Sequence, residues 1–271
     1  MIITNILKGI RKRWIQRAEK PRFKKVSWFA TRLLKNQDDT QLKTRHFDSF
    51  SLHYIRPYEV LKTYQEIFVE EIYKFETNKT HPVILDCGAN IGISTIYFKT
   101  IYPNAIVHAF EPDANLFEVL SKNIHTNGFK QVELHQAAIW TEHTTLSFDN
   151  KGSEASHIDT TGQSANKVEA IKLSTILSNL DAVDFLKMDI EGAEYEVVKD
   201  CAPYLHKIEN FFLEYHGKAS DTHKLNELLK LVENAGFKVY IKMAADNLKH
   251  PFAQKETGTI YDVQLNIFCY K

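Results

Sequence analysis

The feature that most constrains the fold is an apolar segment that runs into a glycine turn and then into a helical pattern, at residues 83–92 (VILDCGANIG). Gly88 and Gly92 lack a Cβ, so the backbone can turn sharply there and approach a ligand closely. The helix that follows, to about Ile101, begins with free N–H groups and the positive end of its dipole. Such a start can hold an anion, which predicts a nucleotide-like ligand at this turn.

The rest of the chain repeats the alternation of strands and helices. Strand-like runs lie at 105–110, 132–135, 184–188, 209–215, 239–241 and 263–269, with helical patterns at 113–128, 193–201 and 220–236. Repeated strand–helix units predict a mostly parallel sheet with both faces covered and right-handed crossovers. We therefore expect a Rossmann-like, doubly wound α/β domain.

The chain of 271 residues divides into an extension and one domain. Residues 1–58 form a basic, partly helical extension. The domain covers 59–271: a lead-in segment at 59–80 with a helix from Glu59 to Phe75, a cofactor-binding half at 83–140, a variable polar segment at 141–172 and a substrate half at 173–271. The polar segment is expected to be a long loop or a hairpin. A cover over the site and a plain surface excursion both remain open.

Charge is distributed unevenly along the chain, although the total is zero. The first 35 residues hold eleven Lys and Arg against one acid, a net charge of +10, so the remainder carries −10. An acidic body argues against nucleic acid as a partner. Apolar residues at helical spacing within 2–15 predict a basic amphipathic helix. It either contacts an anionic membrane surface or a protein partner, or it packs on its own domain or lies as a solvated arm.

The compartment is predicted from cysteines and apolar segments. Cys87, Cys201 and Cys269 are widely spaced and odd in number, which favours a reducing compartment. No stretch reaches the roughly 18 apolar residues of a membrane-spanning helix, and no secretory signal is recognisable. We expect a cytoplasmic protein, with at most a peripheral contact at the inner membrane surface.

An acid at the end of the second strand predicts how the ligand is held. Glu111 lies 23 positions after Gly88, near the ~20-residue spacing of a ribose-binding acid. NAD is the natural rival, but its fingerprint has a third loop glycine where Asn90 stands. Asp86 would place negative charge beside a pyrophosphate and suits a methionine ammonium better. Ser94 or Thr95 can add a hydroxyl donor, so the turn favours S-adenosylmethionine.

Several segments together resemble the FkbM-type methyltransferases. They are VILDCGANIGISTIYF, HAFEPD, AAIW and LKMDIEGAE, with LEYHG at a later strand end, and the resemblance runs from about 66 to 237. It implies a seven-stranded sheet with an antiparallel last strand and O-methylation, often of sugar or polyketide-like hydroxyls. It also implies that Ala138 lies near the adenine and that the cofactor is contacted by Asp86, Gly88, Ala89, Asn90, Gly92 and Glu111. The T-L-D run that often precedes the fourth strand in the family is absent from 174–178.

The catalytic groups are expected where the carboxyl ends of parallel strands meet. Asp189 and Glu191 follow one strand, and Glu214 and His216 end the next. Asp189 is predicted to orient the methionine part or the acceptor hydroxyl, and His216 is the better pH-matched base. In the alternative interpretation, Glu191 and Glu194 only stabilise a helix N-terminus. A divalent metal at Asp189 and Glu214 is chemically feasible but nothing in the spacing requires it, so we predict none.

The sequence thus predicts a methyltransferase that uses S-adenosylmethionine to methylate a hydroxyl of a sugar, glycan or other small natural product. Two alternatives remain open. One is an NAD-dependent oxidoreductase or epimerase with a Rossmann domain. The other is a methyltransferase-like binding module without turnover that docks to a membrane.

Overall fold

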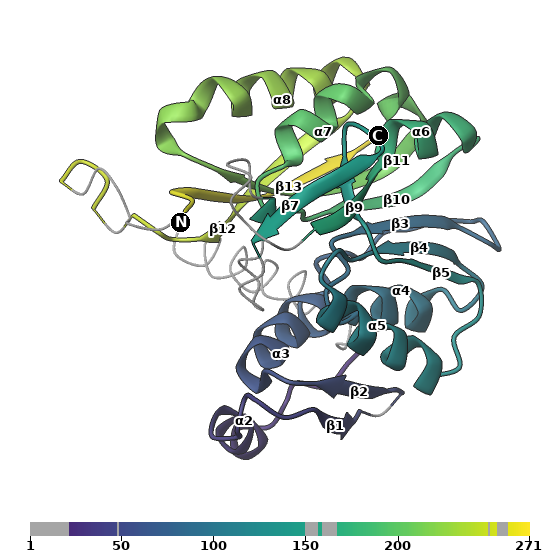
Figure 1. The fold of residues 1–271 in the computed structure, drawn as a ribbon, viewed down its shortest axis with the longest axis vertical. Coiled ribbons are helices and arrows are strands. Elements are labelled where there is room, and N and C mark those ends of the chain that lie inside the picture. Colours follow the sequence, from purple (N-terminus) through teal and green to yellow (C-terminus); the bar gives the residue numbers. More distant parts are fainter. Residues whose placement is uncertain (1–21, 48, 150–156, 159–166, 249, 254–259) are drawn as a thin grey trace, which may run out of the picture. The chain divides into compact units, whose positions relative to one another are not determined.

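The computed structural model describes residues 22–47, 49–149, 157–158, 167–248, 250–253 and 260–271. The described chain forms two compact units (Figure 1). The first combines residues 22–39 with 56–72, and the second combines 40–55 with 73–271. The basic amphipathic helix expected within 2–15 lies outside the described residues.

The first unit is helical, with α2 (Trp28–Lys35), α3 (Pro57–Tyr64) and the π-helical turn η1 (Gln65–Val69). Phe68 is fully buried and packs between Phe23 and Tyr64, with ring centroids 4.8 and 5.1 Å away. The helix expected to reach Phe75 ends at Val69. Glu71 adopts a left-handed φ of 49°, and the N–H of Ile72 donates to the carbonyl of Glu66, which closes the helix end.

A seven-stranded sheet forms the centre of the second unit, in the order β12-β13-β11-β10-β3-β4-β5 (Figure 1). Its first five strands in sequence are parallel, and β13 pairs antiparallel with both β11 and β12. The predicted fold class, including the antiparallel last strand, is confirmed. The strands are β3 (Val83–Cys87), β4 (Ile106–Phe110), β5 (Val132–His135), β10 (Val183–Met188), β11 (Ile208–Gly217), β12 (Lys238–Ala245) and β13 (Val263–Tyr270).

Helices cover the two faces of this sheet. In Figure 1, α4 (Ile93–Ile101) and α5 (Ala114–Thr126) lie on one side, and α6 (Leu173–Asn179), α7 (Glu194–Cys201) and α8 (Thr222–Asn234) lie on the other. Strand β10 is buried along its whole length because both faces are covered. The strand order reverses between β3 and β10, and ligands of open α/β sheets bind beyond the carboxyl ends at such a point.

The polar segment at 141–172 forms, together with residues 138–140, a second, four-stranded sheet rather than a long loop. Its strands are β6 (Ala138–Trp140), β7 (Thr144–Asp149), β8 (His157–Ile158) and β9 (Lys167–Lys172), in the order β6-β9-β7-β8. The antiparallel pair β7–β9 corresponds to the hairpin alternative. Helix α6 was not expected, since its serines and threonine weaken the helical pattern. The remaining residues of the segment, 150–156 and 159–166, lie outside the described chain.

A hairpin of β1 (Lys43–His46) and β2 (Ser51–Tyr54) belongs to the second unit, although the sequence placed it in the extension. Two asparagines of α5 hold it. The side-chain amide of Asn123 bonds to both the N–H and the carbonyl of His53, at 2.6 and 3.0 Å, and Asn127 does the same to Ser51. Asn123 also donates to the carbonyl of Ile91 in the glycine turn, at 2.7 Å. The hairpin is therefore linked to the turn through α5.

Within the described chain, no helix combines the length and the apolar character that crossing a bilayer requires.

Candidate active site

The loops that follow β3 and β10 touch at the point where the strand order reverses. The N–H of Asp189 donates to the carbonyl of Cys87 at 3.1 Å. Gly88 has a φ of +83°, and a Cβ built on it would lie 1.8 Å from the carbonyl oxygen of Asp189. Only glycine fits this position, because both the left-handed backbone and the contact exclude a side chain.

The glycine turn itself is held by main-chain bonds to β4. The N–H groups of Gly88 and Ala89 both donate to the carbonyl of Phe110, at 3.0 and 2.9 Å. Gly92 is the N-cap of α4 with a φ of +88°. Asn90 has a φ of 50°, and its side-chain carbonyl accepts from the N–H of Ile91 at 2.7 Å. An asparagine therefore takes the left-handed position where a dinucleotide loop would have glycine.

Asp86 is fully buried at the end of β3, and one of its two oxygens is satisfied from α4. The hydroxyls of Ser94 and Thr95 both donate to Oδ2, each at 2.6 Å. Both hydroxyl protons are thus used on Asp86 in this structure, and the expected donation to the ligand stays a prediction. The other oxygen, Oδ1, has no hydrogen-bond partner among the described residues, and Nζ of Lys187 lies 3.6 Å away.

Glu111 reaches back from β4 to the turn, and its expected role in binding a ribose stays a prediction. Its Oε2 accepts from the N–H of Asn90 at 2.8 Å, and its Oε1 accepts from the N–H of Asp113 at 2.9 Å. Each carboxylate oxygen keeps one lone pair for a further donor. Burial raises the pKa of Glu111 to about 7, although the two backbone donors and the charge of Lys187 act in the opposite direction.

Lys187 is a central residue of the site that sequence reasoning did not single out. It is buried within β10, and its Nζ donates to the carbonyl of Gly88 at 2.5 Å. The same atom lies 3.5 Å from Oδ2 of Asp189 and 3.6 Å from Oδ1 of Asp86. Burial lowers the pKa of Lys187, but Asp189, Asp86 and Glu214 more than offset this and raise it. A lysine in a strand that is buried along its whole length was the available signal, since buried cations need partners.

His216 is enclosed by carboxylates at the end of β11. Its Nδ1 lies 3.0 Å from Oε1 of Glu194, and its Nε2 lies 3.6 Å from Glu191 and 3.8 Å from Glu214. Burial lowers the pKa of His216, but Glu194 and Glu191 together raise it to about 10. At neutral pH the ring is an imidazolium, so its surroundings do not match the expected role as a free base.

Glu194 and Glu191 differ in function, although they are close in sequence. Glu194 is fully buried and accepts from the N–H groups of Ile190 and Gly192, so it organises the loop after β10 as well as binding His216. Burial, with Asp189 as the next cause, raises the pKa of Glu191 to about 9. The alternative in which both acids only stabilise a helix N-terminus does not describe these contacts.

Asp189, Glu191 and Glu214 each have about a quarter of the side chain exposed, whereas Glu194 is fully buried. The structure thus brings together all four predicted catalytic residues. One ligand atom each from Asp189, Glu191 and His216 lies within 4.8 Å of the others, so the arrangement can hold a cation. The expectation that no metal is held at Asp189 and Glu214 stays a prediction.

Tyr261, which precedes β13, also reaches this cluster. Its hydroxyl donates to the carbonyl of Glu191 at 2.5 Å, and its ring lies 5.1 Å from that of His216. Gly192 has a φ of +99°, and a Cβ there would lie 2.3 Å from the hydroxyl. The separation of 70 residues in sequence gave no signal for this contact.

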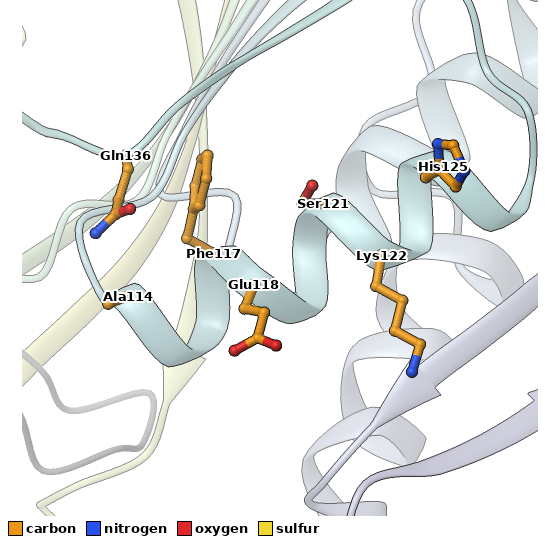
Figure 2. Close-up of a pocket in the computed structure, with 7 residues that line it drawn as sticks. All are labelled: Ala114, Phe117, Glu118, Ser121, Lys122, His125 and Gln136. Atoms are coloured by element: carbon orange, nitrogen blue, oxygen red, sulfur yellow. The ribbon is translucent and has the colours of Figure 1, made fainter.

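A shallow groove of about 510 Å³ runs along α5, separate from the residues above. Figure 2 shows Phe117 and Gln136 at its end near the start of α5, with Lys122 and His125 farther along the helix. Ala138 is buried at the start of β6 and does not line this groove. Its expected position near an adenine stays a prediction.

Comparison with known proteins shows which families and relatives the sequence is similar to. The sequence model of the methyltransferase FkbM domain matches residues 86–239. The chain is 28% identical to "Methyltransferase 1" of Beauveria bassiana over 72% of this chain and 88% of that protein. It is 30% identical to "Methyltransferase sdnD" of Sordaria araneosa over 56% and 73%, respectively. It is also 27% identical to "2-O-methyltransferase NoeI" of Sinorhizobium fredii over 51% and 64%.

Proposed function

The chain belongs to the methyltransferase FkbM domain family, and from this premise we propose that it transfers a methyl group from S-adenosylmethionine to a hydroxyl. The observation that carries the proposal is the glycine turn at Gly88, with the carboxylates of Asp86 and Glu111 beside it. Family membership places the chain among methyltransferases and decides against the NAD-dependent oxidoreductase. The cofactor, the acceptor and the residue roles are our inference.

The residues of the turn fit an amino-acid-bearing nucleoside. Oδ1 of Asp86 is a buried acceptor without a hydrogen-bond partner, which suits the ammonium of a methionine moiety. Glu111 keeps one lone pair on each oxygen for the two ribose hydroxyls. Glycine at 88 leaves the backbone open to close approach. When bound, S-adenosylmethionine supplies an electrophilic methyl group on a positively charged sulfur.

Asp189 is our candidate for the group that receives the acceptor hydroxyl. Burial raises the pKa of Glu191, and Glu194 and Glu191 raise the pKa of His216 despite its burial, so both groups hold a proton more tightly than free side chains do. Asp189 is partly exposed and is held by Lys187 at 3.5 Å. In this proposal, Asp189 orients the hydroxyl and accepts its proton as the oxygen is methylated. Glu214 offers a second acceptor for a polyhydroxyl substrate.

Two observations support the class of acceptor that we propose. They are the carboxylates of the site and the activity for which one relative is named. Carboxylates accept hydrogen bonds from neighbouring hydroxyl groups, as sugars and many natural products present them. The Sinorhizobium fredii relative is named as a 2-O-methyltransferase. We infer a small hydroxylated acceptor, with a sugar or glycan as the first class to test.

The test combines binding with turnover. S-adenosylmethionine, and not NAD, should raise the melting temperature, because a ligand at 100 times its Kd stabilises the folded state by about 2.7 kcal/mol. Labelled methyl from the cofactor should enter a hydroxylated compound in extracts. Asp189→Asn should bind the cofactor but lose most transfer, whereas Asp181→Asn, at an exposed position, should retain both. A protein that binds the cofactor but labels nothing would favour the binding module without turnover.

For the basic segment at 1–35 we propose a peripheral contact with an anionic membrane surface. Its described part presents Trp28 and Leu33 with 74% and 58% of their surface exposed, next to Arg32 and Lys35. The guanidinium of Arg32 lies over the Trp28 ring at 5.6 Å. Exposed aromatic and aliphatic side chains beside cations are typical of helices that lie in the membrane interface.

A further inference from the structure

A second cluster of metal-ligand side chains lies on the seven-stranded sheet, among residues that the proposed reaction does not use. It consists of His108 on β4 with Glu133 and His135 on β5. His108 and Glu133 are partners in the register of the two parallel strands. His135 is two residues beyond Glu133 and therefore projects from the same face of the sheet. All three side chains thus converge because of strand pairing, not because of loop conformation.

The distances fit a single small ion. Nδ1 of His108 lies 3.0 Å from Oε2 of Glu133, and Nε2 of His135 lies 3.9 Å from the same oxygen. All three atoms lie within 4.8 Å of one another. Two ligands at 2.0–2.1 Å from a tetrahedral zinc are about 3.4 Å apart, which falls between the two measured separations. Small side-chain rotations bring the three atoms to bonding distance.

Of the three side chains, His135 is the one that its neighbours hold best in position for binding a metal ion. Its ring stacks on Phe110 with centroids 4.5 Å apart and planes inclined by 11°. Its carbonyl accepts from the N–H of Glu111 at 3.1 Å. Its Nε2 is buried and has no hydrogen-bond partner among the described residues. A buried ring nitrogen without a partner costs stability, and a metal ion would satisfy it.

The donor set selects the type of metal. Two imidazoles and one carboxylate suit zinc, whereas magnesium and calcium prefer oxygen ligands. Glu133 is 65% exposed, so water reaches the site and can complete the coordination. Glu169 on β9 is a further carboxylate near enough to act electrostatically on His135. The competing explanation is a plain surface ion pair between His108 and Glu133, which would contribute little.

We propose that His108, Glu133 and His135 bind a zinc ion that ties β5 to β4. Strand β5 is the last strand of the sheet on this side and has one neighbour, β4. Ligands from both strands would hold this edge together independently of the hydrogen-bond ladder. Because His135 and Glu111 share a main-chain bond, the ion would also steady the strand ends beside the ribose acid. The site needs no methyl transfer, so its test is independent of the proposed function.

The test is a zinc titration of metal-free full-length protein at pH 7.5, followed by calorimetry and by melting temperature. We expect one zinc per chain and a rise in melting temperature that saturates at one equivalent. Cobalt in place of zinc should give the visible bands of a four-coordinate site. His108→Ala and His135→Ala should each weaken zinc binding by more than about tenfold, since losses in the second shell alone cost 10–100-fold.

Controls separate this site from other histidines and from the active-site cluster. His206→Ala removes an exposed imidazole elsewhere and should bind zinc like the wild type. Circular dichroism and urea unfolding should show that the two histidine variants are folded, and Glu133→Gln should weaken zinc binding with less change of shape. No zinc-dependent shift in the wild type would overturn the proposal. So would zinc binding that survives both histidine substitutions or that is lost in Glu191→Gln.

Discussion

At the scale of single residues, the presence or absence of a Cβ atom decides whether the backbone can adopt the conformation that the site requires. Gly88 and Gly128 both have left-handed backbones, with φ of +83° and +64°. A Cβ at Gly88 would meet the carbonyl of Asp189, whereas a Cβ at Gly128 would have nothing within 4 Å. Alanine substitutions at the two glycines therefore separate two contributions to the free energy of unfolding. One is the strain of the left-handed backbone, and the other is the contact between the two loops.

Gly88→Ala should destabilise the protein by about 2–5 kcal/mol, because left-handed strain adds to overpacking against the loop after β10. Gly128→Ala should cost only about 1–2 kcal/mol, from the strain alone. Urea unfolding of both variants measures the difference. Equal losses would mean that the contact with Asp189 does not constrain position 88.

Glu111 should make cofactor binding depend on pH. Its folded pKa of about 7 lies above the model-compound value of 4.5, so its protonation contributes stability below pH 4.5 that is lost as pH rises through 7. Ribose hydroxyls donate to the ionised form, so cofactor affinity should move in the opposite direction. Affinity should rise about tenfold from pH 6 to pH 8.

Glu111→Gln provides the control for that titration. The amide cannot ionise, so calorimetric titrations of this variant with S-adenosylmethionine should show weaker binding without the rise between pH 6 and pH 8. A wild-type affinity that stays constant over this range would contradict the role of Glu111.

At the scale of elements, the hairpin β1–β2 is held by side chains of α5, which bond to its backbone as a neighbouring strand would. The amide of Asn123 bonds to both backbone groups of His53 and to the carbonyl of Ile91. One buried side chain thus joins the hairpin, the helix and the glycine turn. Because the hairpin has only two strands, its stability depends on this docking.

Asn123→Ala should detach the hairpin, because it leaves buried backbone groups without partners at a cost of about 2–4 kcal/mol. Hydrogen exchange of residues 51–54 should accelerate strongly. Asn115→Ala, an exposed change in the first turn of the same helix, should leave this exchange as in the wild type. Unchanged exchange in Asn123→Ala would show that other contacts hold the hairpin.

At the scale of the whole molecule, charge is separated along the chain. Residues 1–35 carry +10 and the remainder −10, so a neutral protein has a strongly basic end. The charge of such a segment attracts anionic lipid at about 1 kcal/mol per cation near the surface, and salt weakens this attraction.

The full-length protein should therefore co-sediment with vesicles that contain anionic lipid and not with neutral vesicles, and raised salt should release it. Trp28→Ser with Leu33→Ser should reduce sedimentation, because it removes the exposed apolar contacts of α2. Phe252→Ser, at a fully exposed position outside this segment, is the matched control and should sediment like the wild type. Equal sedimentation with both vesicle types would remove the membrane contact.

Local sequence patterns determined the main sheet and the cofactor turn. The runs at 83–85, 132–135 and 184–188 became strands, the first extended to residue 87, because short apolar segments bounded by turn residues have few other stable conformations. Asp113 caps α5 by accepting from the N–H groups of Asn115 and Leu116, at the start of the helical pattern expected from residue 113. Glu111 meets the glycine turn because neighbouring parallel strands end at the same edge of the sheet.

Only the tertiary structure decided what these local patterns leave open. The small sheet in 138–172 and the docking of β1–β2 depend on pairing between distant segments, which carries no local signal. The state of His216 depends on Glu194 and Glu191, and Tyr261 reaches the site across 70 residues. Sequence patterns therefore determined where the chemistry is placed. Burial and long-range contacts, which set pKa values and hydrogen-bond partners, decided which residue is charged, which is neutral and which is held in place.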